Sequence, residues 1–217
     1  MLSFLNKPFA RSQTTSQNPL VTDNGATLTE FFMPEHPHDA FCVKQTFFKD
    51  KYLKMKAAGD EAVITPPYHW HLNQIEYFEI EKGSLILTVD GKDTVASSQD
   101  GMLTIQPGEY HTFHFNPEST EDLVVKIWAE PEDGATEQFF RNLFSYLDDC
   151  KKNKTAPNVF QLLLFLHSAE TYLVLPKLPK FIGKFVSRHI LGFVGGKIIG
   201  EKLLGFRENY PEYTTPN

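Results

Sequence analysis

The sequence predicts a mainly β protein in which an antiparallel barrel is followed by an α-helical extension at the C-terminal end. Between about residues 28 and 131 the chain consists of short β-type runs separated by turns, which is typical of sandwiches and barrels. Beyond this stretch the apolar residues change to helical spacing. We therefore expect a flexible N-terminal arm over 1–27, a β-barrel over 28–131 and a helical extension over 132–217.

The barrel strands are predicted from runs of β-branched, aromatic and aliphatic residues between turn residues. In chain order these runs are "AVIT", "IEYFEI", "SLILTV", "MLTI", "HTFHF" and "LVVKIWA". The dipeptide Asp90-Gly91 lies between two of them and predicts a tight hairpin, because both residues tolerate the positive φ angles of such a turn.

The extension is predicted to contain three helical segments. "TEQFFRNLFSYLDDCKKN" and "APNVFQLLLFLHSAETYLVL" carry apolar residues at helical spacing. The third segment, 176–204, is basic, apolar and rich in glycine, and Gly192, Gly196 and Gly200 share one helical face that allows close approach of another backbone. The favoured interpretation is a helix packed on the barrel or on a second subunit. Contact with an anionic membrane surface is the less favoured alternative.

The bulk composition excludes some classes of function. The net charge is −6, so a main role in nucleic-acid binding is excluded by the missing basic excess. Cys42 and Cys150 are the two cysteines, which favours a reducing compartment, and no stretch has the length of a membrane-spanning helix. We expect a cytoplasmic protein with a small-molecule partner.

A candidate metal site follows from strand alternation in "PPYHWHLNQIEYFEIEKG". Residues two apart on a strand share a face, so His69 and His71 point to the same side. A returning strand brings Glu76 back to them, and the turn Gln106-Pro107-Gly108 delivers His111 on a further strand. Three imidazoles and one carboxylate suit a divalent transition metal. Fe and Mn are favoured, and Zn and Ni remain candidates.

These motifs resemble the cupin superfamily. HxH, four residues, Glu, six residues and Gly83 is similar to the first cupin motif, and Gly101, Pro107-Gly108 and His111 are similar to the second. The resemblance covers roughly residues 40 to 131 and implies a small jelly-roll barrel in which His69, His71, Glu76 and His111 bind the metal. The sequence departs from the motifs at Val63, Gln106 and Phe115, which lie at turns and strand ends.

Four protein ligands leave open positions on a six-coordinate ion, which favours catalysis over a closed structural site. Alternation places Phe78 on the Glu76 face and Phe113 and Phe115 on the His111 face, so these three are predicted to line the substrate pocket. No arginine occurs between Arg11 and Arg141, which disfavours phosphate and dicarboxylate substrates. An apolar or phenolic small molecule is expected.

The leading hypothesis is a metal-dependent oxidoreductase. The barrel with a helical tail and the ending "GFRENYPEYT" also resemble cupin oxidoreductases of fungal biosynthetic gene clusters, which implies a role in secondary-metabolite (polyketide) biosynthesis. The alternatives are a cupin isomerase, lyase or cyclase that uses the metal as a Lewis acid, and a non-catalytic binding cupin. Tyr68, Glu109 and Tyr110 are candidate proton donors, but no catalytic residue is assigned. A homodimer is expected by analogy with cupins.

Overall fold

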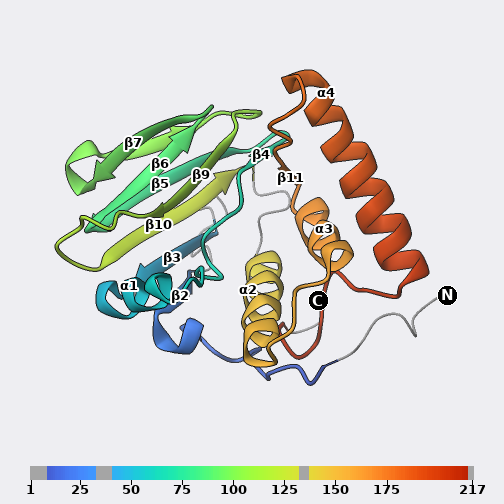
Figure 1. Cartoon of the computed structure of the whole chain (residues 1–217), viewed down its shortest axis with the longest axis horizontal. Coiled ribbons are helices and arrows are strands. Elements are labelled where there is room, and N and C mark those ends of the chain that lie inside the picture. The colour runs from blue at the N-terminus through green and yellow to red at the C-terminus, as the bar shows by residue number, and fades with distance from the viewer. Residues whose placement is uncertain (1–8, 33–40, 132–136, 215–217) are drawn as a thin grey trace. The chain divides into compact units, whose positions relative to one another are not determined.

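The computed structural model describes residues 9–32, 41–131 and 137–214, and the chain divides into two compact units (Figure 1). Residues Gln17–Asp133 form one of them, which we call the barrel unit. Residues Met1–Ser16 and Gly134–Asn217 together form the other, the helical unit. The helical unit is therefore built from segments on both sides of the barrel in the sequence.

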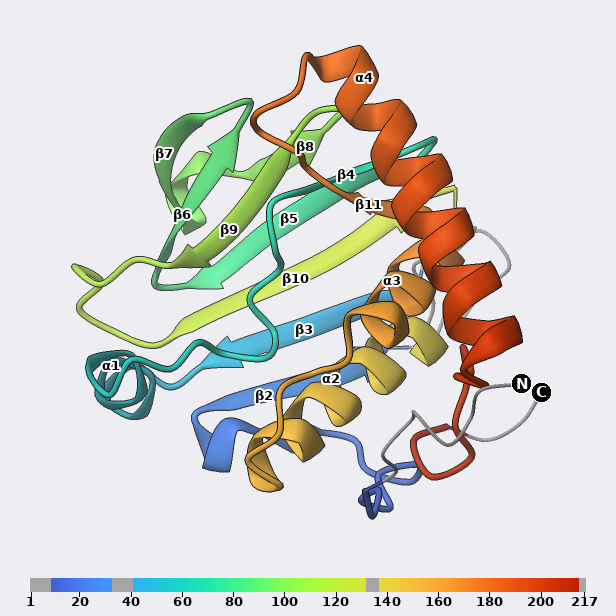
Figure 2. The ribbon, with the colours of Figure 1, turned by 45° about the vertical axis from the view of Figure 1, so that its right-hand side comes forward.

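The barrel unit contains two antiparallel sheets. The first has six strands in the order β1 (Leu20–Thr22), β2 (Thr27–Phe32), β3 (Cys42–Phe47), β10 (Leu123–Glu130), β5 (Ile75–Lys82) and β8 (Met102–Ile105). Figure 2 shows β2, β3 and β10 as successive neighbours in this sheet. Within the barrel unit the second sheet runs in the order β4 (His69–His71), β9 (His111–Phe115), β6 (Ser84–Val89) and β7 (Lys92–Ser97).

The hairpin between β6 and β7 confirms the predicted turn. Asp90 and Gly91 have φ angles of 47° and 81°, which is the left-handed conformation that a two-residue hairpin turn needs. Single turns of 3-10 helix, η2 (Asp23–Gly25) and η3 (Ser98–Asp100), and the helix α1 (Lys49–Ala57) complete the regular structure of the barrel unit among its described residues.

The core of the barrel unit comes from alternate residues of the strands, as the period of two requires. On β3, for example, Val43, Gln45 and Phe47 are buried while their neighbours are more exposed. Their partners on β10, Val125 and Ile127, are buried on the same side. The expected antiparallel jelly-roll barrel followed by helices is confirmed.

Two local predictions were wrong. The run "AVIT" at residues 62–65 is a turn and not a strand, although Ala62, Val63 and Ile64 are buried, because these apolar residues fill the core from a loop. The helix α1 lies in a stretch that was expected to contain only strands and turns. Its apolar residues do not recur at helical spacing, and Tyr52 is the one that is fully buried.

The predicted arm divides between the two units. Residues 20–22 form the edge strand β1, and residues 9–16 contribute to the helical unit. Residues 1–8 and 132–136 lie outside the described part of the chain. The boundaries at 27 and 131 stay a prediction.

The helical unit contains α2 (Glu137–Lys152), α3 (Val159–Ser168), the short strand β11 (Thr171–Leu173), α4 (Lys180–Phe185) and the π-helix η4 (Val186–Leu203). The first and third predicted segments are helical over most of their described residues. The second is helical only from Val159 to Ser168, because Thr171–Leu173, which were expected to be helical, form the strand β11. Asn158 begins α3 as an N-cap, with its side-chain oxygen accepting a hydrogen bond from the Phe160 N–H. None of the described helices is long and apolar enough to cross a membrane.

A buried carboxylate joins three distant segments of the helical unit. Asp149 on α2 accepts hydrogen bonds from the Ser12 N–H at 2.8 Å and from the Tyr213 hydroxyl at 2.7 Å. Asp149 is 1% exposed, so these donors replace the water that the carboxylate loses on burial. Residues 9–16 and 206–214 are thereby fixed to the same helix.

Candidate metal centre

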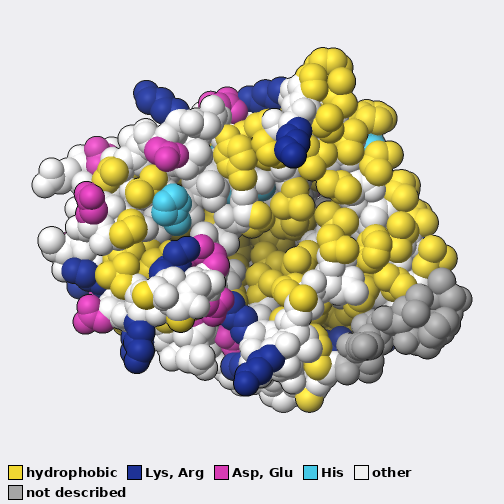
Figure 3. All heavy atoms as spheres, in the orientation of Figure 1, with side chains coloured by type: hydrophobic (Ala, Val, Ile, Leu, Met, Phe, Trp, Pro, Cys, Tyr) yellow, Lys and Arg dark blue, Asp and Glu magenta, His cyan; other side chains and the backbone are white. Residues whose placement is uncertain are grey.

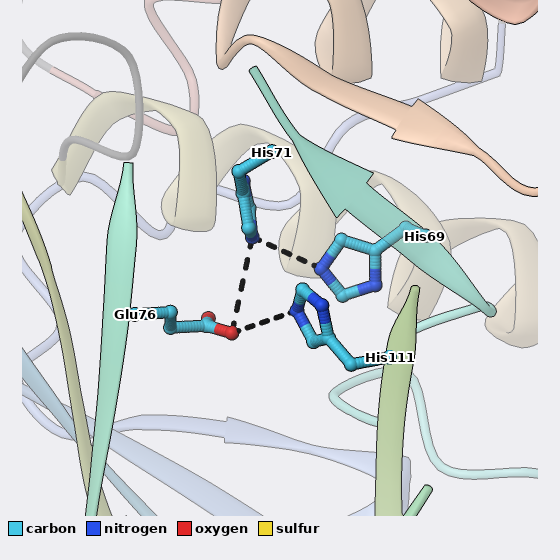
Figure 4. A group of neighbouring side chains, drawn as sticks. All are labelled: His69, His71, Glu76 and His111. Atoms are coloured by element: carbon cyan, nitrogen blue, oxygen red, sulfur yellow. Dashed lines mark hydrogen bonds and ion pairs between the residues drawn. The ribbon is translucent and has the colours of Figure 1, made fainter. Parts of the chain in front are cut away.

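The four predicted ligands come from three strands of the two sheets. His69 and His71 are the ends of β4, and His111 begins β9 beside it, in register with His69. Glu76 lies on β5 of the other sheet, opposite Ala129 of β10. Figure 4 shows the four side chains pointing toward one another.

The turn before His111 is held against β4. The Gly108 N–H donates a 2.9 Å hydrogen bond to the His71 carbonyl, and Gly108 has a φ angle of 79°, which glycine adopts without strain. Glu109 supports the same turn by accepting a 2.7 Å hydrogen bond from the Gln106 N–H. The Pro-Gly motif therefore fixes where β9 starts and, with it, where His111 lies.

Each of the four side chains offers one ligand atom, and the four atoms are close enough together to bind the same ion. One nitrogen or oxygen from each residue lies within 4.8 Å of every other. The His111 Nε2 is 2.9 Å and the His71 Nε2 is 3.8 Å from the Glu76 Oε2, and the Nε2 atoms of His69 and His71 are 3.2 Å apart. The three histidines are buried, with exposures of 5% or less.

Backbone carbonyls select the tautomer of two of the histidines. The His69 Nδ1 is 2.8 Å from the Pro67 carbonyl oxygen, and the His111 Nδ1 is 3.1 Å from that of Glu109. A carbonyl oxygen only accepts hydrogen bonds, so the Nδ1 atoms carry the protons and donate. Each Nε2 is then left with a lone pair that faces the cluster. This is the usual orientation of metal-binding histidines.

The contact between His111 and Glu76 tests whether the residues fit a metal ion. In the tautomer that Glu109 selects, the His111 Nε2 and the Glu76 Oε2 are both acceptors, yet they are 2.9 Å apart. Both atoms are buried, and neither makes a hydrogen bond with the described residues. Two buried acceptors at this distance repel each other unless a cation lies between them. The group can hold a divalent metal ion.

Burial keeps these imidazoles in the form that binds metals. Desolvation lowers the pKa of His69 well below its usual range, and the neighbouring His111 and His71 lower it further. Desolvation, followed by the effect of His111, lowers the pKa of His71 to about 3. His69 and His71 are therefore neutral at physiological pH, with lone pairs available for an ion.

The predicted pocket residues Phe78, Phe113 and Phe115 lie inside the barrel, each 3% exposed or less. The rings of Phe78 and Phe113 are 5.3 Å apart, and Phe115 packs against Tyr52 on α1 at 5.1 Å. They form part of the packed core of the barrel unit. Their role as a substrate pocket stays a prediction.

Two other polar side chains near the motifs, Lys126 and His114, point away from the site. Lys126 lies on the outer face of β10, where it makes ion pairs with Glu81 at 2.7 Å and Glu79 at 3.4 Å. His114 faces away from His111 on the same strand, as the alternation predicted. Tyr68 and Tyr110 flank the histidines in sequence, and their rings contact each other edge to face at 6.0 Å.

Two buried polar residues of the barrel interior were missed. Thr29 on β2 and Gln45 on β3 are opposite each other in the register and are both 2% exposed or less. The Thr29 Oγ1 and the Gln45 Oε1 have no hydrogen-bond partner among the described residues. Strand alternation could have identified Gln45 as buried, because it lies on the same face as Val43 and Phe47.

No family model matches the chain. Among curated proteins, the chain is 31% identical over 208 residues to "Probable oxidoreductase virH" of Hypocrea virens, covering 94% of this chain and 89% of that protein. It is 37% identical over 175 residues to "Oxidoreductase iacF" of Pestalotiopsis fici, covering 78% and 82%. Among solved structures, a cupin-like protein from Thermotoga maritima matches with a TM-score of 0.34 and 13% identity, covering 56% of this chain and 80% of that one.

The two-sheet barrel, the grouped ligand residues and these relatives define the class of protein. The chain belongs to the family of these fungal oxidoreductases, and its two-sheet barrel and grouped ligand residues agree with the resemblance of its sequence to the cupins. It is therefore an enzyme of the oxidoreductase type.

Proposed function

We propose that the protein is a metal-dependent cupin oxidoreductase that acts on an apolar or phenolic small molecule. The observation that carries the proposal is the convergence of three histidine nitrogens and one carboxylate oxygen within 4.8 Å of one another. In this proposal His69, His71, Glu76 and His111 hold one divalent ion. Fe or Mn is favoured, and Zn and Ni are alternatives.

The metal would supply Lewis acidity toward a substrate oxygen and, as Fe or Mn, the redox chemistry of oxygen activation. The protein's part is to hold and orient the ligands. The Pro67 and Glu109 carbonyls keep the lone pairs of His69 and His111 directed inward. The single negative charge of Glu76 lowers the charge of the site, and burial of the histidines keeps bulk water out of their contacts.

The lining of the barrel supports an apolar or phenolic substrate. The buried side chains that are described in the barrel unit include Phe47, Phe78, Phe113 and Phe115 but neither lysine nor arginine. An anionic substrate would leave its charge uncompensated in such an interior, at considerable cost. An aromatic ring with a hydroxyl group would match the interior and would present an oxygen to the site.

The relatives support an oxidative role, since two fungal proteins that carry the name oxidoreductase cover most of the chain. On this basis and on the resemblance to fungal cluster enzymes we place the reaction in secondary-metabolite biosynthesis, in the cytoplasm. We further expect a homodimer, which light scattering of the purified protein tests.

The first experiment is metal analysis by mass spectrometry on protein purified without chelators and without a metal-affinity step. The test variant is His69→Ala/His111→Ala. The matched control is His114→Ala, which removes an imidazole from the same strand as His111 but from the opposite face. Oxygen uptake with simple phenols is then measured on the metal-loaded proteins.

About one Fe or Mn per chain in the wild type and in His114→Ala, lost in the double variant, supports the proposal. Stoichiometric Zn with the same pattern favours the Lewis-acid isomerase, lyase or cyclase instead. Absence of metal from all three proteins, with none taken up on refilling, means that the four residues are not a metal site and the proposed function is wrong.

A further inference from the structure

The helices α4 and η4 carry a continuous row of exposed apolar side chains. Its members recur every four or five residues and are 38% to 76% exposed, and we call them the apolar stripe. They are Phe181, Phe185, Ile190, Val194, Ile198 and Leu203. Figure 3 shows hydrophobic side chains gathered along the right-hand side of the molecule, over α4 and η4. The four-to-five-residue period matches the wide turn of a π-helix, so the stripe stays on one face.

The opposite face of the same helix is already occupied. Gly196 packs so closely on α3 that an added Cβ would lie 2.9 Å from backbone atoms of Leu163 and Leu164. At Gly200 the added atom would lie 2.9 Å from the Phe160 carbonyl oxygen. The glycine face therefore contacts α3 within the helical unit, a partner that the sequence did not indicate. A helix that is apolar on two faces normally has two partners, and α3 is only one of them.

The charge of this segment indicates the second partner. Between Pro176 and Leu204 the basic side chains are Lys177, Lys180, Lys184, Arg188, Lys197 and Lys202, against the single acid Glu201. The segment thus has a net charge of +5, six positive charges minus one, in a chain whose total is −6. Two such stripes face to face would bring like charges together, which disfavours a second copy of this chain as the partner.

We propose that the apolar stripe and its flanking lysines lie on the surface of an anionic lipid bilayer. Phenylalanine and branched aliphatic side chains enter the boundary between headgroups and acyl chains, while lysines beside them contact the anionic headgroups. Lys177 and Lys180 are exposed next to Phe181, the most exposed member of the stripe, so apolar and basic groups are side by side at this end of the helix. The helix lies on the membrane rather than across it, in agreement with its length and polarity.

The test is co-sedimentation of the full chain with two kinds of vesicle. One kind contains phosphatidylcholine and phosphatidylserine in equal amounts, and the other contains phosphatidylcholine alone. The stripe variant is Phe181→Ser/Phe185→Ser. Its matched control is Val95→Ser/Met102→Ser, which removes two apolar side chains of the barrel unit that are more than half exposed, as Phe181 and Phe185 are. A charge variant, Lys177→Glu/Lys180→Glu, tests the contribution of the lysines.

We expect the wild type and the control to bind the vesicles that contain phosphatidylserine, more weakly at high salt, since screening weakens the attraction of lysines to the headgroups. The stripe variant is expected to lose about tenfold or more in binding, because burial of even one phenylalanine is worth about that factor. The charge variant is expected to retain weak binding without preference for phosphatidylserine. Neither lipid binding nor its loss depends on the metal, so the outcome is independent of the proposed function.

Three results would overturn the proposal. The first is no sedimentation of the wild type with either vesicle. The second is equal binding by the stripe variant and the control. The third is a wild-type dimer in light scattering that the stripe variant converts to a monomer while vesicle binding is absent, which would identify a second copy as the occupant.

Discussion

Substitution of Gly83 by alanine is expected to destabilise the barrel unit through two separable effects. Gly83 has a φ angle of 73°, which costs an alanine about 1–2 kcal/mol. An added Cβ would also lie against the Asp122 carbonyl oxygen and 3.1 Å from the Leu123 Cα, so the backbone at the start of β10 has to move. Overpacking of this kind costs about 1–3 kcal/mol, which gives a total of about 2–5 kcal/mol.

Gly91 provides the control for this prediction. Its φ angle of 81° carries the same conformational cost, but no heavy atom lies within 4 Å of the added Cβ. Gly91→Ala is therefore expected to lose only about 1–2 kcal/mol. The difference between the two variants isolates the contact with β10.

Urea denaturation followed by tryptophan fluorescence measures both variants. Both tryptophans of the chain, Trp70 and Trp128, belong to the barrel unit, so the signal reports on that unit. With an m-value of about 2 kcal/mol/M, the midpoint of Gly83→Ala should fall about 1–2.5 M below that of the wild type. If Gly83→Ala loses no more free energy of unfolding than Gly91→Ala, the close contact with β10 is not the reason for glycine at position 83.

Thr29→Val is expected to raise the free energy of unfolding of the barrel unit by about 1 kcal/mol, because it removes a buried hydroxyl that has no partner among the described residues. Thr27→Val on the same strand should lower it by about 1–2 kcal/mol, since the Thr27 hydroxyl contacts Thr22 and Asp23 at 2.7 and 2.8 Å. Urea denaturation compares the two, and a loss of stability in Thr29→Val would mean that its hydroxyl binds water or another molecule. His167→Gln is expected to make the stability of the helical unit less dependent on pH. Burial, and after it Lys197, lowers the pKa of His167 in the folded state, so the unfolded state binds more protons as the pH falls below about 6.5, and the folded state is then penalised. Thermal unfolding followed by circular dichroism between about pH 7.5 and 5.5 measures this, and identical pH profiles for variant and wild type would contradict it.

The candidate site could be predicted because the position of each histidine depends on a short stretch of sequence. Strand alternation alone places His69 and His71 on one face, and the turn at Gly108 fixes the start of the strand that carries His111. The contribution of the second sheet was less evident, since nothing local states that Glu76 returns on a strand of the opposite layer. The sequence indicated only that a strand returns after a short turn and brings Glu76 back toward the histidines.

Features that depend on distant contacts were not predictable. The contact of Ser12 with Asp149 joins residues 137 positions apart, and a contact across such a distance produces no periodic pattern in the sequence. The partner of the glycine face was missed for the same reason, because small residues at every fourth position predict close approach without identifying what approaches. Helix α1 was missed because its apolar residues lack the helical period.

The hydrogen bonds that the Asp149 carboxylate accepts have a consequence for synthesis of the chain. Its donors come from residue 12 and residue 213, so one of them is made before the barrel strands and the other after them. The strands β1 to β10 of the barrel unit all precede Asp149, so they can pair and bring the four ligand residues together while Asp149 still lacks the Tyr213 hydroxyl. Protein with a folded barrel unit but an open helical unit is thus the expected product of any truncation that removes the last few residues of the described chain, including Tyr213.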